Sequence, residues 1–79
     1  AGVYELSPGR LMTITFENGG LYAQLTHQPM YEIFAISPTE FFYRVVEARI
    51  VFKVGVSGLA QALVIHQNGR ESLAKRVTP

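Results

Sequence analysis

The segment Ser72-Leu73-Ala74-Lys75 has the one spacing in this chain that is associated with an activated nucleophile. In a Ser-x-x-Lys site, the serine begins a helix and the lysine lies one turn later on the same face, where it can activate the hydroxyl. On a β-strand, residues three apart point to opposite faces. The chain also lacks Ser-Asp-Asn and Lys-Thr-Gly segments and contains no aspartate. We therefore interpret this spacing as coincidental and predict no catalytic residue.

Two histidines and six glutamates are the other candidates for chemistry. His27 and His66 lie too far apart for a metal-ligand spacing, and no cysteine or aspartate is present to complete a zinc site. The glutamates are spread singly along the chain, whereas acid and base catalysis by carboxyl groups needs a pair. His66 alternates with Ile65 and Gln67, which predicts an outward, solvated side chain. The sequence therefore predicts no metal site and no cofactor.

The rest of the chain consists of short segments in which apolar and polar residues alternate, and each segment ends at a glycine, proline, asparagine or serine. These segments must position the candidate residues above. Turns about every eight to twelve residues are typical of antiparallel sheets, and no segment has the apolar spacing of a long helix. The pairs Asn18-Gly19 and Asn68-Gly69 favour tight hairpins, and Ser7-Pro8-Gly9 forces a reversal. The pattern predicts eight strands, over residues 2–6, 11–16, 21–26, 30–36, 41–46, 48–53, 59–67 and 70–77.

The predicted fold is all-β, with residues 1–79 forming a single eight-stranded antiparallel up-and-down barrel. A meander hides its apolar face by closing on itself, and a chain of this length has no room for a second core. An eight-stranded barrel is either filled by its own side chains or holds one small ligand. Medium-sized inward side chains favour a filled interior. The candidate lining of this core, or of a cavity within it, is Leu21, Leu25, Ile33, Phe41, Tyr43 and Phe52.

Composition limits the classes of partner. Apolar residues make up 48% of the chain and charged residues 16%. The charged share is well below the roughly 25% of a typical soluble domain, which indicates apolar surface that another molecule covers. A net charge of +1 is too small to attract a nucleic-acid backbone. No segment approaches the roughly 18 apolar residues of a membrane-spanning helix, no secretion signal is present, and no compartment is indicated.

The segment Phe41-Phe42-Tyr43 cannot bury all three rings, because successive side chains of a strand point to opposite faces. We expect Phe42 to point outward and to form an apolar patch, a candidate interface, with Tyr22, Phe34 and Val51. The alternative is that these side chains are scattered single exposures, which are ordinary on protein surfaces.

Five segments in order carry a resemblance to a known family. They are Gly2-Val3-Tyr4-Glu5-Leu6, Leu21-Tyr22-Ala23-Gln24-Leu25, Glu40-Phe41-Phe42, Ile50-Val51-Phe52 and Leu63-Val64-Ile65-His66-Gln67-Asn68-Gly69, with Arg76 after them. Over nearly its whole length, the chain resembles the lipocalin-like β-barrel domain, of unknown function, that commonly follows serine hydrolases of the β-lactamase and penicillin-binding type. The resemblance implies a non-catalytic accessory module beside a catalytic domain. The segment Val54-Gly55-Val56-Ser57-Gly58 departs from the family, which often has an aspartate here, so no ion or polar contact is carried over to this loop.

A Gly-x-aromatic start and an arginine in the last strand also resemble the pairing by which lipocalins close one end of the barrel. If the first and last strands are neighbours, the Arg76 guanidinium can lie over the Tyr4 ring in a cation–π contact, which contributes about 0.5–2 kcal/mol. The alternative is that Arg76 reaches solvent near the C-terminus. Either role is structural.

Two functional hypotheses follow. The first is an interaction module that buries apolar surface against an adjacent serine-hydrolase domain or against a second copy of itself. The second is a carrier of a small apolar ligand inside the barrel, which requires a cavity of at least ~300 Å³. An independent enzyme has the least support, because no nucleophile, base and orienting group occur in a recognisable arrangement.

Overall fold

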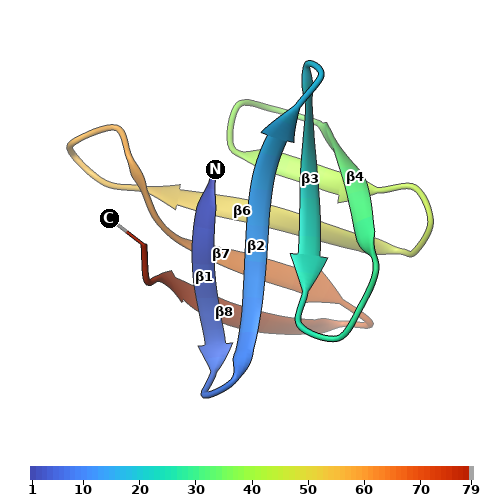
Figure 1. The fold of residues 1–79 in the computed structure, drawn as a ribbon. Coiled ribbons are helices and arrows are strands. Elements are labelled where there is room, and N and C mark those ends of the chain that lie inside the picture. Colours follow the sequence, from blue (N-terminus) through green and yellow to red (C-terminus); the bar gives the residue numbers. More distant parts are fainter. Residues whose placement is uncertain (79) are drawn as a thin grey trace.

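Eight strands follow one another around a closed barrel (Figure 1). The computed structural model describes residues 1–78; residue 79, which the sequence assigns to the same domain, lies outside the described residues. Each strand pairs antiparallel with the next, and the last returns to the first, so the predicted all-β up-and-down barrel is confirmed. The strands are β1 Gly2–Ser7, β2 Arg10–Glu17, β3 Gly20–Leu25, β4 Met30–Ala35, β5 Glu40–Tyr43, β6 Ala48–Val54, β7 Ala60–Gln67 and β8 Arg70–Arg76. Residues 1–78 contain no helix, and hence none that could cross a membrane.

The two Asn-Gly pairs form hairpin turns, as expected. The φ angles are 50° and 80° at Asn18 and Gly19, and 54° and 73° at Asn68 and Gly69. Positive φ at both central residues defines the type I′ turn, whose twist matches that of the flanking strands. His27 also has a positive φ, 67°, in the turn between β3 and β4. His27 is therefore part of the turn that reverses the chain between β3 and β4.

The fifth strand is shorter than predicted, so the prediction over residues 41–46 is wrong at its end. β5 ends at Tyr43, and residues 44–47 connect it to β6. Val45 and Val46 are 63% and 42% exposed in this connection. The Arg44 guanidinium lies 3.9 Å from the centroid of the Phe34 ring. The turn contains no glycine, proline or asparagine, which usually mark a reversal, and its two valines are typical of strands. The sequence of this turn is therefore indistinguishable from that of a strand.

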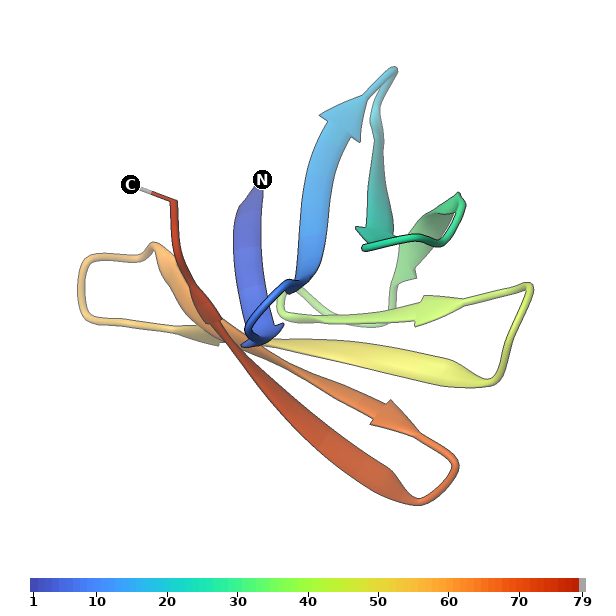
Figure 2. The same ribbon diagram turned by 60° about the horizontal axis from the view of Figure 1, so that its bottom comes forward.

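Two ends of the barrel can be distinguished. In an up-and-down barrel, alternate turns lie at the same end. The termini lie near each other on the side of the β6–β7 loop, whereas the β5–β6 and β7–β8 turns lie on the other side (Figure 2). The end that holds Gly2, Tyr4, Phe52 and Arg76 is termed the closed end. The opposite end, at the β1–β2, β3–β4, β5–β6 and β7–β8 turns, is termed the open end.

The core fills the middle of the barrel and the closed end. The ring centroid of Phe52 lies 6.0 Å from that of Tyr4 and 5.6 Å from that of Phe41, in edge-to-face contacts. Such contacts add about 0.5–1.5 kcal/mol each to the effect of burial. The fully or nearly fully buried members of the core are Tyr4, Met12, Ile14, Ala23, Ile33, Ile50, Leu63 and Ala74.

Closure of the barrel depends on a short seam between β1 and β8. Only two pairs of residues are in register there, Tyr4 with Arg76 and Glu5 with Lys75. By comparison, six pairs join β7 to β8. The Val77 N–H extends this short ladder by donating a hydrogen bond to the carbonyl of Val3 at 2.9 Å, and side-chain contacts reinforce it.

Arg76 provides those contacts. Its Nε donates a hydrogen bond to the carbonyl of Ala60 at 2.7 Å, Nη1 donates to Thr78 Oγ1 at 3.0 Å, and Nη2 donates to the carbonyl of Ala1 at 3.0 Å. The guanidinium carbon lies 5.2 Å from the centroid of the Tyr4 ring, within cation–π range. One side chain therefore ties β7, β8 and the N-terminal segment together.

The glycine at position 2 makes room for this arrangement. Gly2 has a φ of 151°, which side-chain-bearing residues rarely adopt, and a Cβ atom there would collide with the Arg76 guanidinium. In the Gly-x-Tyr sequence, Gly2 thus lets the backbone approach the Arg76 guanidinium closely, and Tyr4 supplies the ring on which this guanidinium lies.

Replacing Arg76 with methionine should lower the free energy of unfolding by about 2–4 kcal/mol, because the hydrogen bonds and the cation–π contact are lost. Arg76→Lys should also destabilise by at least about 1 kcal/mol, since an ammonium cannot reproduce the planar fork of donors. Chemical denaturation measures both values, with Lys75→Met on the outer face of the same strand as the control. An Arg76→Lys variant as stable as the parent would contradict this role.

Candidate functional site

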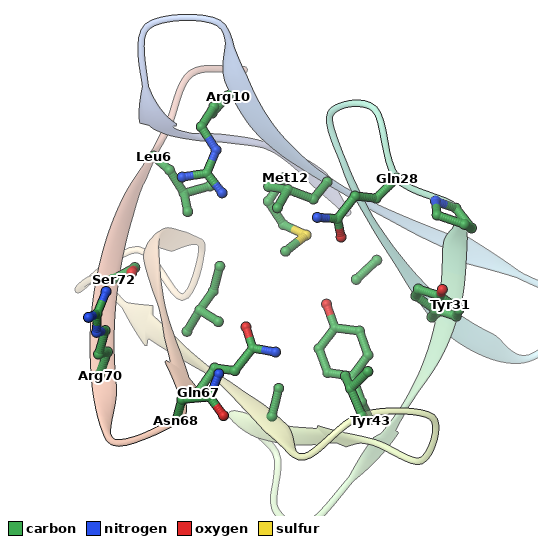
Figure 3. Close-up of a pocket in the computed structure, with 16 residues that line it drawn as sticks. Leu6, Arg10, Met12, Gln28, Tyr31, Tyr43, Gln67, Asn68, Arg70 and Ser72 are labelled. Carbon is green, nitrogen blue, oxygen red and sulfur yellow. The ribbon is translucent and has the colours of Figure 1, made fainter.

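A cavity of about 550 Å³ occupies the open end of the barrel. Its wall includes side chains from three of the four turns at this end, and Leu6 and Arg10 from the strand ends beside the fourth (Figure 3). Its apolar lining consists of Leu6, Met12, Ala23, Leu25, Pro29, Val46, Ala48 and Ile65. Its polar and aromatic lining consists of Arg10, Gln28, Tyr31, Tyr43, Gln67, Asn68, Arg70 and Ser72.

Small inward side chains create this space. Ala23, Ala48 and Ser72 occupy positions that face the interior at the open end. At the closed end, the equivalent inward positions hold aromatic rings such as Phe41 and Phe52. A barrel of eight strands has an interior just wide enough to be filled by large side chains, so small ones leave it hollow. The barrel is therefore packed at one end and open at the other.

Several polar groups converge on the centre of the cavity. Figure 3 shows the Tyr43 hydroxyl and the side-chain amide of Gln67 pointing into it from the β5 and β7 side. The side-chain amide of Gln28, from the β3–β4 turn, and the guanidinium of Arg10, from the start of β2, extend towards the same space from the opposite side. Ligand sites typically combine a mainly apolar lining with a few such polar groups, which orient the ligand.

The charges that line the cavity have one sign. Arg10 and Arg70 are the two charged lining residues, and no glutamate is among them. Each arginine lies at the start of a strand, β2 or β8, at the mouth of the cavity. A concave apolar surface bordered by cations attracts anions more strongly than an isolated surface charge does.

Tyr43 contributes a neutral phenol. Its ring centroid lies 6.4 Å from that of Tyr31 in an edge-to-face arrangement. Burial raises the pKa of the Tyr43 hydroxyl from 10.0 to about 12, because the phenolate would lose its hydration. The group is therefore a hydrogen-bond donor throughout the physiological pH range.

The six residues expected to line the core or a cavity are divided between the two halves of the interior. Leu25 and Tyr43 line the cavity. Ile33 is 3% exposed and belongs to the core, and the remaining three pack against it, namely Leu21, Phe41 and Phe52. The division follows position along the strands: on β5, Phe41 lies towards the closed end and Tyr43 towards the open end.

The residues that sequence reasoning missed are the polar ones at the mouth. On β7, Gln67 continues the inward alternation of Leu63 and Ile65. On β8, Arg70 and Ser72 precede buried Ala74 at intervals of two. The twofold alternation, extended to the ends of the strands, places these residues on the inward face, because the period does not depend on polarity. It does not show that this face borders a cavity.

The four candidate interface residues lie on the outer surface, and all of them are partly buried. The ring centroids of Phe34 and Phe42 are 5.8 Å apart, and Arg44 covers the Phe34 ring. Tyr22 is paired with Glu32 on β4, and Val51 is paired with Glu40 on β5, one row away from the two rings on either side.

Ser72 and Lys75 lie on β8 and on opposite faces of it. Ser72 lines the cavity, whereas Lys75 is exposed on the outer surface opposite Glu5. This strand geometry does not bring the lysine amine to the serine hydroxyl.

His66 lies on the outer surface of β7. Its Nδ1 atom is 3.4 Å from Glu71 Oε2, and its side chain is 26% exposed, so it is less solvated than an ordinary surface histidine. Both residues line a second groove, of about 640 Å³, between the β5–β6 and β7–β8 turns. This groove adjoins the cavity at the open end and shares five lining residues with it, namely Tyr43, Ala48, Gln67, Asn68 and Arg70. Within residues 1–78, no three histidine or glutamate side chains are grouped closely enough to hold a metal ion.

The Tyr43 phenol should titrate with a midpoint of about 12 rather than 10.0. The unfolded chain loses this proton first, so the contribution of Tyr43 to stability is complete below about pH 10 and is lost as the pH rises to 12. The difference in phenolate absorbance between the parent and Tyr43→Phe isolates this group, with circular dichroism as the check on folding. A difference midpoint at the ordinary value would contradict the burial of this hydroxyl.

Comparison with known proteins places this barrel in a family. No curated protein and no solved structure matches the chain. A sequence model of one family matches residues 1–76, which is nearly the whole chain and includes all eight strands. The chain therefore belongs to the family described as "Domain of unknown function (DUF3471)".

Proposed function

We propose that this domain is a non-catalytic barrel that binds a small ligand with an apolar body in the cavity at its open end. The cavity volume of about 550 Å³ carries the proposal. Binding sites for small molecules typically measure about 300–1,000 Å³. The apolar side chains of Leu25 and Ile65 would contact the body of the ligand, and the groups at the mouth would orient it.

The construction of the barrel supports binding at this end. Aromatic packing and the Arg76 contacts fill the closed end, so the open end is the route by which a ligand would enter. The small side chains Ala23 and Ala48 leave the interior accessible without displacing the core.

The absence of catalysis is part of the proposal. Among the described residues, the one nucleophile with a motif-like neighbour is Ser72, and Lys75 lies on the other face of its strand. The nearest histidine on the neighbouring strand is His66, which lies on the outer surface. This arrangement supports retention of a ligand rather than its conversion.

The dye N-phenylnaphthylamine, which is neutral and fluoresces in apolar sites, should bind to the domain with one-to-one stoichiometry. Ser72→Phe should weaken this binding about tenfold or more, since a ring at this partly open position occupies part of the cavity. Fluorescence titration measures both affinities. Leu73→Phe, one residue along on the outer face, is the matched control and should leave the affinity unchanged. Equal losses in the two variants would contradict the proposal, and so would a parent domain that binds neither this dye nor a second small ligand with an apolar body.

A second candidate function is docking against another protein domain. The outer cluster of Phe34, Phe42 and Arg44 favours it, as do many exposed apolar side chains. These side chains are Phe16, Met30, Ile36, Val45, Val46, Val54, Val56, Leu59, Leu73 and Val77. The resemblance to lipocalin-like domains that follow β-lactamase-type serine hydrolases makes such a hydrolase domain the proposed partner, and a second copy of this chain the alternative. The two candidate functions use different surfaces and are compatible.

Phe42→Ser should leave the barrel folded but weaken docking at least about tenfold, because truncation of a central aromatic side chain commonly costs 2 kcal/mol or more. Sedimentation velocity of the domain at micromolar concentration measures self-association. The same experiment with a β-lactamase-type domain, if one is encoded upstream of residue 1, measures docking to a hydrolase. Phe16→Ser, which removes an exposed ring from the β2–β3 end, is the control. Association that is unchanged by Phe42→Ser would exclude this face.

A further inference from the structure

The five arginines of this chain fall into two groups. Three of them have evident partners within the described residues. Arg76 donates three hydrogen bonds and lies over the Tyr4 ring, Arg49 forms an ion pair with Glu40, and Arg44 covers the Phe34 ring. Each of these three guanidinium groups therefore has a structural role, either in closing the barrel or in contacts on its outer surface.

The other two arginines, Arg10 and Arg70, both line the cavity. Within residues 1–78, neither one forms an ion pair or a side-chain hydrogen bond. Arg10 follows the inward alternation of buried Met12, and Arg70 follows that of buried Ala74. Both therefore start from backbone positions that face the interior, and no carboxylate lines the cavity. Glu47 and Glu71 line the adjoining groove, which Arg70 also borders, but within residues 1–78 neither of them forms an ion pair with Arg70.

A guanidinium without a partner at the mouth of an apolar cavity is complementary to a ligand that has both an anionic group and an apolar body. Its planar fork of N–H donors fits a carboxylate, and it binds one through charge-assisted hydrogen bonds. The side-chain amide of Gln67 and the neutral hydroxyl of Tyr43 offer further donors beneath the mouth (Figure 3). Farther inside, the lining is apolar, with Met12 and Ile65.

We infer that the ligand is an anionic amphiphile, a monocarboxylate whose apolar tail occupies the cavity and whose carboxylate lies at the mouth between Arg10 and Arg70. This inference rests on the proposed function and specifies its ligand class. A neutral apolar ligand would bury its tail equally well but would leave both guanidinium groups without a counter-charge.

Octanoate and octanol form a matched pair of probes, because they have the same chain length and differ in the charge of the head group. Both displace N-phenylnaphthylamine if they enter the cavity. Octanoate should bind about tenfold more tightly than octanol, the usual effect of a hydrogen bond to a charged group. Added salt should reduce this advantage, because the charges lie at the solvent-accessible mouth.

Substitutions of the two arginines test whether they cause the preference for octanoate over octanol. Arg10→Gln and Arg70→Gln should each lower the octanoate affinity about fivefold to tenfold, and should leave the octanol affinity within about twofold. Lys75→Gln removes the same charge from the outer face of the strand that carries Arg70, and it should change neither affinity. The double variant Arg10→Glu with Arg70→Glu should prefer octylamine to octanoate, a reversal that a purely structural role of these residues would not produce.

The outcomes separate this inference from the proposed function. Dye binding with equal displacement by octanoate and octanol would overturn the anionic ligand and retain the binding barrel. Equal losses of octanoate affinity in Arg70→Gln and Lys75→Gln would also overturn it. If the dye does not bind, isothermal titration calorimetry measures octanoate directly, and the absence of heat in that titration would overturn both proposals.

Discussion

The contact between Arg76 and Tyr4 is the interaction on which the rest of this structure depends. An eight-stranded meander has two free edges, and only their pairing makes an inside and an outside. Here the ladder between β1 and β8 is short, so the guanidinium reinforces it by binding to β7, to the N-terminal segment and to the Tyr4 ring. Gly2 leaves space for that group. Without this seam, the strands would remain an open sheet and could not enclose a cavity.

Closure at one end also determines what the other end can do. The Tyr4, Phe41 and Phe52 rings concentrate the bulky side chains near the seam, and this packing supplies much of the stability of a small domain. The open end can therefore hold small and polar side chains at inward positions, such as Ala48 and Ser72, which contribute little to the core. The tightly packed core and the cavity are thus located in different halves of one barrel.

Much of the fold can be predicted from the sequence, because most of its turns contain residue types that specify a turn. Asn18-Gly19 and Asn68-Gly69 specify their hairpins, and the twofold alternation between turns specifies the inward face. The turn over residues 44–47 could not be found in this way, since its valines resemble a strand and its reversal depends on contacts such as Arg44 over Phe34.

The candidate site is less readable than the fold. Leu25 and Tyr43 are apolar or aromatic inward residues that any alternation pattern identifies. Arg70 and Gln67 are polar, and polar residues beside a turn are ordinarily solvent-exposed, so local sequence does not distinguish a surface group from a group at the mouth of a cavity. Only closure of the barrel brings the β1–β2 and β7–β8 turns to the same end and gathers these side chains around one space.

The central claim is that the open end of this barrel is a ligand site. Its most direct test is a titration of the ¹⁵N-labelled domain with N-phenylnaphthylamine and, separately, with octanoate, followed by amide chemical shifts. The account predicts progressive, saturable shifts at amides around the cavity, such as those of Leu25, Gln67 and Ser72, with little change at Val3 and Arg76 at the closed end. Shifts confined to the outer face at Phe34 and Phe42, or no saturable shifts, would contradict it.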